Sequence, residues 1–306
     1  MTEVLVGVDV GGSGLRCRVE VDGVPGPVHA APGARITPTG IDIGALVDSV
    51  APCVDPVGRP DVLVWSMRGL MALADPAVVM ATLQARFAAV RTALVGDALA
   101  AMVGAVGGVR PGAVVAAGSG AVAFATDFDR TWRRIDGWGH ILGDRGSSAW
   151  VGLRALESAL EAHDGVSSGG AALLVAATER LGHPELWPRQ VMTRSDAVEL
   201  IASLAPSVTA LAATDPEAAR ICGDAGRALA RSLAAAAAGI EGARLSRTGG
   251  LLGAAPVRRA FEAEAQRLGL DVTPPMGTNL DGAIALARHL AAGLELSGDA
   301  AYLVVA

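Results

Sequence analysis

The sequence predicts an α/β protein built from two similarly organised parts. Residues 4–10, VLVGVDV, form an apolar β-rich run that ends in a glycine turn, and residues 15–21 alternate apolar and polar as a half-buried strand does. A second apolar run at residues 113–120, AVVAAGSG, ends in the same kind of turn. Each part continues from strand, turn and strand into alternating helices and strands. At 306 residues the chain exceeds the usual size of one core, which favours two domains.

The first part contains a hairpin and then alternates between helix and strand. Asp22-Gly23 predicts a tight turn into residues 24–30. The elements expected next are an amphipathic stretch near 41–51, a strand at 61–67, a helix at 76–89, a strand at 92–97 and a helix that follows directly.

The second part begins with a three-stranded unit and becomes mainly helical. Residues 121–127 return from the second glycine turn, and residues 131–136 form a third strand. A helix with a serine N-cap begins after Gly146 and stops at Gly165. The remaining elements expected are a helical region over 170–242, a strand and turn at 243–250, and helices near 254–268 and 279–293. We therefore expect one domain over 1–109 and a second over 110–306, with the last helix a candidate for packing back on the first domain.

Composition and charge limit the partners and the location of the protein. The net charge is −6 and the basic residues form no stripe, so we expect no nucleic-acid partner. No apolar run is long enough to span a bilayer, and the first residues lack the basic region of a signal peptide, so we expect no membrane partner. The chain has three cysteines, Cys17, Cys53 and Cys222, which are far apart in the sequence. An odd number at this spacing favours reduced thiols over a disulfide framework. These features favour a cytoplasmic protein.

The sequence contains no lysine, since all 25 residues counted as lysine or arginine are arginines. A Walker A loop, a Schiff-base enzyme and a protein kinase each require a lysine. Any phosphate chemistry in this chain must therefore depend on backbone amides, a metal ion and arginine.

The first candidate site is the segment GVDVGGSG at residues 7–14. Asp9 ends a buried strand and is a candidate carboxylate for Mg²⁺, while the glycine turn offers backbone N–H groups that can surround phosphate oxygens. Because the next strand begins at once, the turn is a hairpin, whereas a dinucleotide fingerprint must open a helix. A plain hairpin turn is the alternative interpretation.

Two further glycine turns strengthen this interpretation. AAGSGAVA at residues 116–123 is the equivalent hairpin of the second part, and two such hairpins facing each other across a cleft could clasp one polyphosphate. RTGG at residues 247–250 follows a strand and could let an adenine or ribose lie flat against the backbone. By itself this last segment is an ordinary turn.

Asp97 lies at the carboxyl end of a strand and the start of a helix, where ligands of open α/β sheets bind. A carboxylate at this place could orient and deprotonate a hydroxyl group. The alternative is a helix N-cap, for which aspartate is a preferred residue.

The motifs DVGGSGLR, GSGAVA, GWGHILGDRGSSAWVG and TGG occur in this order along most of the chain. In order and spacing they resemble the N-acetylglucosamine kinase and benzoyl-CoA-reductase-activator ATPase family, within the sugar kinase, actin and heat-shock chaperone superfamily. The resemblance implies two RNase-H-like domains that flank a cleft with ATP and Mg²⁺. In the kinase branch it implies transfer of the γ-phosphoryl group to the 6-hydroxyl of an amino sugar. Such transfer needs positioning and charge neutralisation, which Mg²⁺, backbone amides and one carboxylate can supply without lysine.

The resemblance also implies roles for single residues. Asp97 resembles the general base that accepts the proton of the sugar hydroxyl, which favours the catalytic interpretation, and Asp9 resembles the carboxylate near Mg²⁺. The nucleotide loops correspond to Gly11, Gly12 and Ser13, to Gly118, Ser119 and Gly120, and to Gly249 and Gly250. The residues expected at the sugar are Ser119, Trp138, Gly139 and Asp144.

The chain departs from the family pattern at two arginines near the expected sugar pocket. Arg35 stands where the family commonly has asparagine, and Arg145 follows Asp144 where it commonly has glutamate. These arginines either alter the sugar selectivity or lie on the outer rim of the pocket. Other singled-out residues have simpler roles: we expect Trp138 and Trp150 mainly to pack, and TDFDR at residues 126–130 to form a surface turn.

Features of the sequence disfavour three other functions. An ATPase that drives electron transfer through an iron–sulfur cluster needs suitably spaced cysteines, which this chain lacks. A sugar sensor usually adds a helix-turn-helix before the first strand, and a nicotinamide dehydrogenase needs a different glycine loop. The substrates expected are therefore ATP and an amino sugar. The sequence leaves open whether the sugar is N-acetylglucosamine, glucosamine or glucose, and whether the protein forms a homodimer.

Overall fold

The structure is a computed structural model that describes residues 2–11, 14–34, 36–37, 40–67, 75–296 and 298–306. Three positions singled out in the sequence, Gly12, Ser13 and Arg35, lie outside these ranges.

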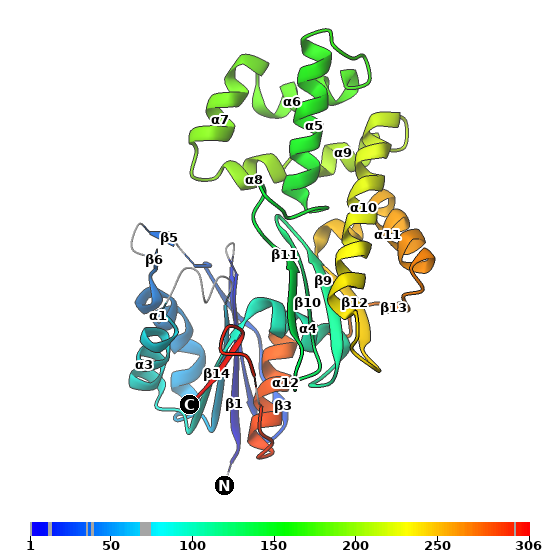
Figure 1. Cartoon of the computed structure of the whole chain (residues 1–306). Coiled ribbons are helices and arrows are strands. Elements are labelled where there is room, and N and C mark those ends of the chain that lie inside the picture. The colour runs from blue at the N-terminus through cyan, green and yellow to red at the C-terminus, as the bar shows by residue number, and fades with distance from the viewer. Residues whose placement is uncertain (1, 12–13, 35, 38–39, 68–74, 297) are drawn as a thin grey trace.

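The strands of the first part form a mixed sheet in the order β14-β8-β7-β1-β2-β3, with β4 beside β2. Strands β1, β7 and β8 run parallel at its centre, as expected from alternating strands and helices. Every residue of β1 is buried because helices cover both faces of the sheet (Figure 1). The strands are β1 Val4–Val10, β2 Leu15–Val21, β3 Val24–Pro25, β4 His29–Ala31, β7 Val62–Met67, β8 Arg91–Gly96 and β14 Leu303–Val305, and a separate pair is formed by β5 Ile36–Thr37 and β6 Gly40–Ile41.

Two layers of helices cover the first sheet (Figure 1). Helices α1, Ile43–Val54, and α3, Pro76–Phe87, lie on one face, with the 3₁₀ turn η1, Asp55–Val57, between them. Helix α12, Asn279–Ala291, covers β1 and β7 on the other face and crosses α4, Asp97–Val106.

Glycine makes the crossing of α4 and α12 unusually close. A Cβ atom on Gly104 would lie 2.0 Å from the carbonyl oxygen of Thr278, and one on Gly282 would lie 2.0 Å from the carbonyl oxygen of Ala100. Only residues without a side chain fit at these two points. Because α4 also packs on the second sheet, this crossing joins the two parts of the molecule.

The second sheet has the order β11-β10-β9-β12-β13, with α4 on one face and α10 on the other (Figure 1). The hairpin of β9 and β10 and the antiparallel third strand agree with the expected three-stranded unit. The elements are β9 Gly112–Ala117, β10 Ala121–Thr126, β11 Trp132–Asp136, β12 Arg244–Thr248, β13 Val272–Thr273, α10 Pro216–Ala237, η3 Gly250–Gly253 and α11 Ala255–Arg267.

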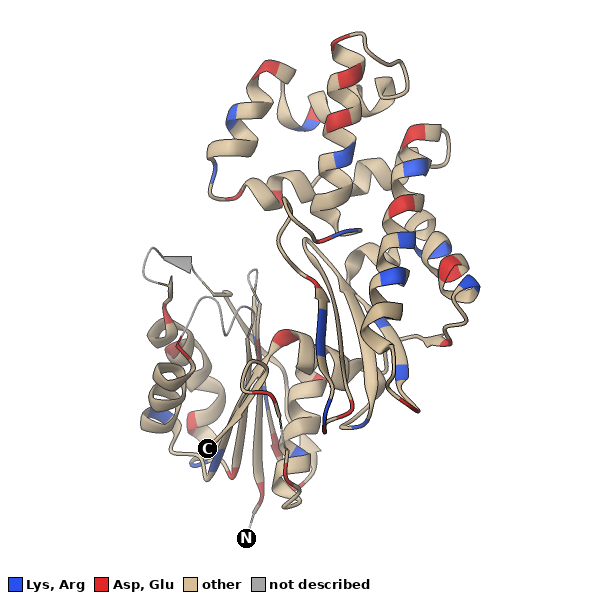
Figure 2. Cartoon of the chain, viewed as in Figure 1, with Lys and Arg blue, Asp and Glu red and all other residues tan. Residues whose placement is uncertain are grey.

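The outer helices α10 and α11 are held together by charge as well as by apolar packing. Figure 2 shows acidic and basic segments alternating along them. The carboxylate of Glu264, almost fully buried, accepts hydrogen bonds from Arg267 and Arg231, each at 2.8 Å. These two bonds lower the pKa of Glu264 to about 2.

The first part of the insertion between β11 and β12, before α10, forms a helical lobe at the top of Figure 1. Its helices are α5 Ser148–His163, α6 Ala171–Leu181, α7 Trp187–Thr193, α8 Ala197–Ala202 and α9 Ala205–Leu211, with the turn η2 Pro184–Leu186. The side chain of Ser147 caps α5 as predicted, by accepting a hydrogen bond from the backbone N–H of Trp150 at 3.0 Å. Among the described residues, no single helix is both long and apolar enough to cross a membrane; residues 197–211 and 216–237 meet that test only as a pair bent by 115°.

The C-terminal strand was missed in the sequence. Strand β14 pairs antiparallel with β8 and so returns the chain to the first sheet. The carbonyl oxygen of Tyr302 accepts a hydrogen bond from the N–H of Gly96 at 3.0 Å, and the Tyr302 ring stacks on Trp132 of the second sheet. The proposed division at residues 109 and 110 stays a prediction, to which the structure adds contacts of α12 and β14 with the first sheet.

Candidate active site

Asp9 is the next-to-last residue of β1 and lies at the carboxyl edge of the first sheet. It is 8% exposed, and the amide of Asn279 donates a hydrogen bond to its carboxylate. Burial and the neighbouring carboxylate of Asp97 raise the pKa of Asp9, while Arg16 and Asn279 lower it in part. The net rise shows that the negative charge of Asp9 is incompletely compensated by the protein.

Asp97 lies at the same edge, because β8 runs parallel to β1 with β7 between them. Gly96 occupies the N-cap position of α4, so the interpretation of Asp97 as the N-cap is wrong by one residue. The Asp97 carboxylate accepts a hydrogen bond from the N–H of Ala98 at 2.9 Å, in the first turn of the helix, where the helix dipole favours negative charge. The structure therefore brings together the two carboxylates singled out in the sequence.

The first glycine turn closes tightly beside these carboxylates. The N–H of Gly11 donates to the carbonyl oxygen of Gly14 at 2.9 Å, and the N–H of Ala34 donates to the carbonyl oxygen of Gly11 at 3.0 Å. The predicted phosphate contacts of Gly12 and Ser13 fall outside the described residues.

The second glycine turn is fastened to the start of α5. The N–H of Ser148 donates to the carbonyl oxygen of Gly118 at 2.8 Å, and the N–H of Ala149 donates to that of Ser119 at 3.1 Å. These bonds use N–H groups that a helix start leaves without helical partners, so the turn is fixed in position by the start of α5. A Cβ atom on Gly118 would meet no atom within 4 Å, which leaves open space beside the turn.

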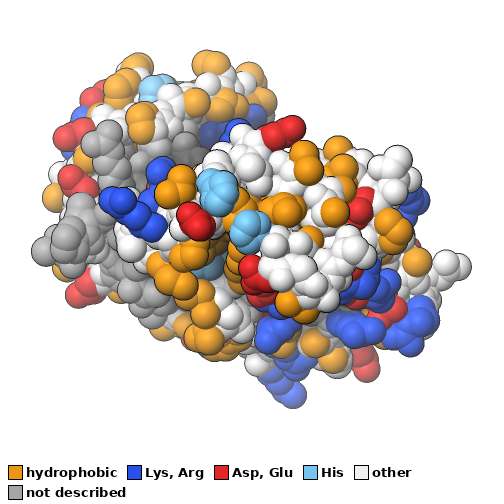
Figure 3. Space-filling model, turned by 90° about the horizontal axis from the view of Figure 1, so that it is seen from above, with side chains coloured by type: hydrophobic (Ala, Val, Ile, Leu, Met, Phe, Trp, Pro, Cys, Tyr) orange, Lys and Arg blue, Asp and Glu red, His pale blue; other side chains and the backbone are white. Residues whose placement is uncertain are grey.

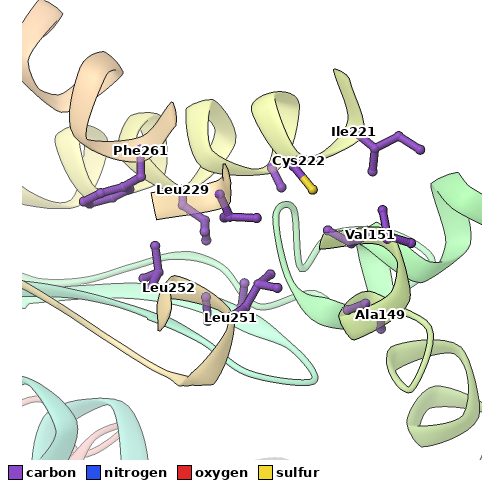
Figure 4. Close-up of a cluster of buried hydrophobic side chains, with 14 of the residues drawn as sticks. Ala149, Val151, Ile221, Cys222, Leu229, Leu251, Leu252 and Phe261 are labelled. Atoms are coloured by element: carbon purple, nitrogen blue, oxygen red, sulfur yellow. The ribbon is translucent and has the colours of Figure 1, made fainter. Parts of the chain in front are cut away.

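The third glycine segment, residues 247–250, packs directly on the end of β9, the strand that leads into the second glycine turn. Gly249 has φ +102°, and a Cβ atom there would lie 2.2 Å from the carbonyl oxygen of Ala117, so only glycine fits. Leu251 and Leu252 then anchor η3 in a buried cluster that includes Leu229 of α10 (Figure 4). The segment RTGG is thereby held against the end of β9.

A cavity of about 420 Å³ lies at the meeting point of the two sheets. It connects Asp9 with Thr248, the residue before the third glycine segment. Its described lining residues are Asp9, Arg16, Thr248, Pro275, Met276, Gly277, Thr278 and Asn279.

The contribution of residues 275–279 to this cavity was missed in the sequence. Thr278 and Asp281 form a capping box at the start of α12, which fixes the loop over the cavity. The pattern TNLD could have revealed the helix start, although nothing in it indicates a ligand. Residues 275–279 reach the cavity because α12, which follows them, packs on β1.

The loop of residues 137–146, where the sequence predicts sugar contacts, is organised by Asp136. This carboxylate, 7% exposed, accepts hydrogen bonds from the backbone N–H groups of Asp144 at 2.8 Å and Arg145 at 2.9 Å. The guanidinium of Arg145 lies 3.6 Å from the same carboxylate. Asp136 was not singled out in the sequence, although Asp-Gly before a glycine-rich loop is a turn signal.

Within this loop, Asp144 is buried and Trp138 is exposed. Asp144 has φ +52°, and its carboxylate accepts a hydrogen bond from the N–H of Gly139 at 3.3 Å. The expectation that Trp138 mainly packs is wrong: it is 64% exposed, and the guanidinium of Arg134 lies 4.6 Å from its ring centre. Trp150, in contrast, packs against the core as expected. Figure 3, the view of the molecule from above, shows exposed hydrophobic side chains scattered among charged and polar ones.

The remaining singled-out segment, TDFDR, is the expected surface turn. The carboxylate of Asp127 accepts hydrogen bonds from the N–H groups of Asp129, Arg130 and Thr131 at 2.8–3.0 Å. All three cysteines are free thiols, with Cys17 and Cys222 buried.

The residues at the sheet edge fit a nucleotide with Mg²⁺. Among the described residues, no cluster of three or more His, Cys, Asp or Glu side chains could hold a metal ion by itself. Magnesium, however, is usually bound through one or two carboxylates together with substrate phosphates and water. Asp9, a carboxylate that lines the cavity and has a raised pKa, has the chemistry of such a ligand.

The site and fold agree with a known family. Residues 72–284 match the BadF/BadG/BcrA/BcrD ATPase family, so the chain belongs to that family. The predicted family and the actin-like two-part fold are confirmed, and with them an enzyme that uses ATP.

Solved structures of similar fold include several proteins named as sugar kinases. A protein of Chromobacterium violaceum provisionally named N-acetylglucosamine kinase has a TM-score of 0.74 and 25% identity, with 93% of this chain and 99% of that chain covered. A Porphyromonas gingivalis protein of the same provisional name has a TM-score of 0.70 and 16% identity, covering 94% and 99%. A ROK family glucokinase of Streptomyces griseus, solved with glucose and AMPPNP, has a TM-score of 0.58 and 16% identity, covering 94% and 99%. The last two show the fold alone.

A sequence relative adds a short match. The N-acetylmuramic acid/N-acetylglucosamine kinase of Clostridium acetobutylicum is 36% identical over 55 residues. The match covers 18% of this chain and 18% of that protein, which is less than two thirds of the relative's length.

Proposed function

We propose that this protein is a cytoplasmic, ATP-dependent sugar kinase that phosphorylates the 6-hydroxyl of N-acetylglucosamine or glucosamine. The observation that carries the proposal is the juxtaposition of Asp9 and Asp97 at one sheet edge, beside a cavity that also reaches Thr248. The sugar class is supported by the similarity to the C. violaceum and C. acetobutylicum proteins.

Asp97 is the proposed general base. The sugar hydroxyl oxygen attacks the γ-phosphorus of ATP, the bond between that phosphorus and the β,γ-bridging oxygen breaks, and ADP leaves. The hydroxyl proton passes to the Asp97 carboxylate, whose place in the first turn of α4 favours its ionised form before transfer.

Asp9 and the glycine turns are the proposed nucleotide ligands. Asp9 would hold Mg²⁺, which would neutralise part of the negative charge of the phosphates. Backbone N–H groups would bind phosphate oxygens at Gly11, Gly12 and Ser13 and at Gly118, Ser119 and Gly120, and the adenosine would lie against Gly249 and Gly250.

The loop after β11 is the proposed sugar-binding element. Trp138 presents an exposed ring flanked by Arg134, a surface that suits the apolar face of a sugar ring. A hydrogen bond holds Gly139 and Asp144 next to each other. We propose that the Asp144 carboxylate and the Ser119 hydroxyl accept hydrogen bonds from hydroxyl groups of the sugar. Asp136 keeps this loop in shape without contacting the sugar.

An electron-transferring ATPase of the same family is disfavoured by the cysteines. An iron–sulfur cluster shared between two subunits needs thiolates at the surface. Cys17 and Cys222 are buried inside separate parts of the chain and Cys53 is only partly exposed. We therefore expect the purified protein to be colourless and to contain no iron.

The experiment that tests the proposal is ADP release measured over a panel of hexoses and amino sugars with saturating ATP and Mg²⁺. We expect turnover that depends on an amino sugar, with phosphate recovered at its 6-hydroxyl. Asp97→Asn keeps the size of the side chain and removes the base, so turnover should fall by about 10²–10⁴-fold while ATP still binds. Asp164→Asn is the matched control, because Asp164 is exposed at the end of α5.

Two results would refute the proposal. One is ADP release that no sugar in the panel stimulates. The other is an Asp97→Asn variant that turns over as fast as the Asp164→Asn control.

A further inference from the structure

Two of the three cysteines, far apart in the sequence, meet in the first part of the molecule. Cys17 lies on the face of β2 that also carries Leu15 and Val19, and this is the side on which α1 packs. Cys53 lies in the last turn of α1 and packs against the same cluster of apolar side chains. The Cys17 thiol donates a hydrogen bond to the Cys53 sulfur, so the two sulfur atoms are in contact.

A second hydrogen bond, one helical turn away, holds the end of α1 against the sheet. His29 of β4 is the cross-strand partner of Cys17. Its Nε2 donates a hydrogen bond to the carbonyl oxygen of Ser49 in α1 at 2.9 Å. Ser49 and Cys53 are one turn apart and therefore lie on the same side of the helix. The pair of strands β2 and β4 thus keeps Cys53 next to Cys17.

The two thiols differ in access and in acidity. Cys17 is 0% exposed, whereas Cys53 is partly exposed. The hydrogen bond from Cys17 lowers the pKa of Cys53, and the same bond, together with burial, raises the pKa of Cys17. Because the thiolate is the form that attacks a disulfide, Cys53 is the first nucleophile of the pair and Cys17 is the thiol that follows.

A cavity of about 470 Å³ leads from the surface to Cys53. Val24 and Val28 line it and are 69% and 45% exposed, so its mouth reaches solvent. Most of the lining residues that the structure describes are valines and prolines, and none of them is an aspartate, glutamate or arginine. An uncharged molecule enters such a cavity easily, whereas a charged one must give up its hydration without gaining a partner.

We propose that Cys53 is a modification site for small, uncharged disulfides, and that Cys17 converts the modified Cys53 into a Cys17–Cys53 disulfide. In the first step Cys53 releases its proton to water and its sulfur attacks one sulfur of the reagent. The sulfur–sulfur bond of the reagent breaks, and the thiolate that leaves takes up a proton. In the second step the Cys17 sulfur attacks the Cys53 sulfur, and the second thiol of the reagent leaves with the proton of Cys17.

The two steps oxidise two cysteines and reduce the reagent to two thiols. The product is a covalent tie between α1 and β2. The inference goes beyond the proposed function and does not depend on the reaction that the protein catalyses.

The test is exposure of the reduced, full-length protein to bis(2-hydroxyethyl) disulfide, followed by intact mass measurement and by peptide mapping at acidic pH, where thiol exchange stops. We expect the wild-type mass to fall by two hydrogens and the map to join Cys17 to Cys53. Cys222 should remain a thiol, since burial raises its pKa to about 11. Oxidised glutathione, a charged disulfide, should react at least about tenfold more slowly.

Three variants separate the two steps. Cys17→Ala should stop at the mixed disulfide on Cys53, and Cys53→Ser should not react. Cys222→Ser is the matched control and should behave as the wild type does. Mapping of the wild-type protein decides which cysteines are joined, whether or not a variant folds well.

Three results would overturn the proposal. The first is a wild-type protein that keeps a stable mixed disulfide on Cys53. The second is a disulfide that involves Cys222 or a second copy of the chain. The third is a folded protein that does not react under conditions in which the urea-unfolded protein does. Equal rates with the two disulfides would overturn the role of the cavity.

Discussion

Asp9 and Asp136 are buried to almost the same degree, yet they are held in opposite ways. Asp9 is 8% exposed and Asp136 is 7% exposed. Asp136 accepts two backbone hydrogen bonds and lies 3.6 Å from the guanidinium of Arg145. Asp9 has the side-chain amide of Asn279, a guanidinium at 4.0 Å, and a second carboxylate, Asp97, near enough to raise its pKa.

The difference indicates what each carboxylate is for. A buried carboxylate whose acceptor sites are filled by N–H groups is part of the structure, and its removal leaves donors without partners. A buried carboxylate whose pKa is raised by burial and by a like charge is costly to keep, and such groups gather at functional sites. Asp136 thus belongs to the scaffold of the loop, and Asp9 to the proposed nucleotide site.

The largest expected effect is that of Asp9→Asn on turnover. We expect the sugar-dependent rate to fall by at least about 100-fold, because the carboxylate proposed to hold Mg²⁺ is lost. The same variant should be at least as stable as the wild type at neutral pH, which urea denaturation across a range of pH measures.

The sign follows from the direction of the pKa shift. The pKa of Asp9 is raised in the folded state, so folding favours the protonated side chain. The stability that this protonated form contributes is complete below the unfolded pKa and is lost as the pH rises through the folded pKa. Near neutral pH the ionised Asp9 therefore lowers the free energy of unfolding, and Asn removes that cost. A clear loss of stability in Asp9→Asn at neutral pH would contradict the comparison with Asp136.

Asp136→Ala should show the opposite pattern. Without this carboxylate the N–H groups of Asp144 and Arg145 lose their acceptor, so we expect the free energy of unfolding to fall by about 2–3 kcal/mol. Asp136→Asn keeps one acceptor oxygen and should lose about half as much. Urea denaturation at neutral pH measures both variants, and an Asp136→Ala variant as stable as the wild type would remove Asp136 from the scaffold.

The sequence predicts the sheet-edge carboxylates well, for a reason visible in the structure. Asp9 and Asp97 each follow an apolar run, and parallel strands place their carboxyl ends at one edge of a sheet. Glycine turns are equally local signals, which is why the two hairpins and the segment before η3 were found where they stand.

The sequence does not predict features that depend on distant packing. Asp136 looks like any acid at a strand end, and only the folded loop shows that its acceptors serve residues eight and nine positions later. The loop over 275–279 reaches the cavity because α12 packs on β1, far away in the sequence. Strand β14 is three residues long and pairs with β8, so it has too few residues for a pattern of its own.

The smallest expected effect sharpens the comparison without changing either carboxylate. A Cβ atom on Gly143 would lie 2.2 Å from Oδ1 of Asp136 and 2.9 Å from the Cβ of Trp138, whereas one on Gly11, beside Asp9, would lie 3.3 Å from the carbonyl oxygen of Gly14. In Gly143→Ala the methyl group must displace the Asp136 carboxylate from its donors, so we expect the free energy of unfolding to fall by about 1–2 kcal/mol. In Gly11→Ala a shift of a few tenths of an ångström relieves the contact, and we expect a loss within about 0.5 kcal/mol. Chemical denaturation of the two variants side by side measures the difference. Equal stabilities would show that the loop around Asp136 yields as readily as the turn near Asp9, and that its carboxylate is not fixed by the bonds described above.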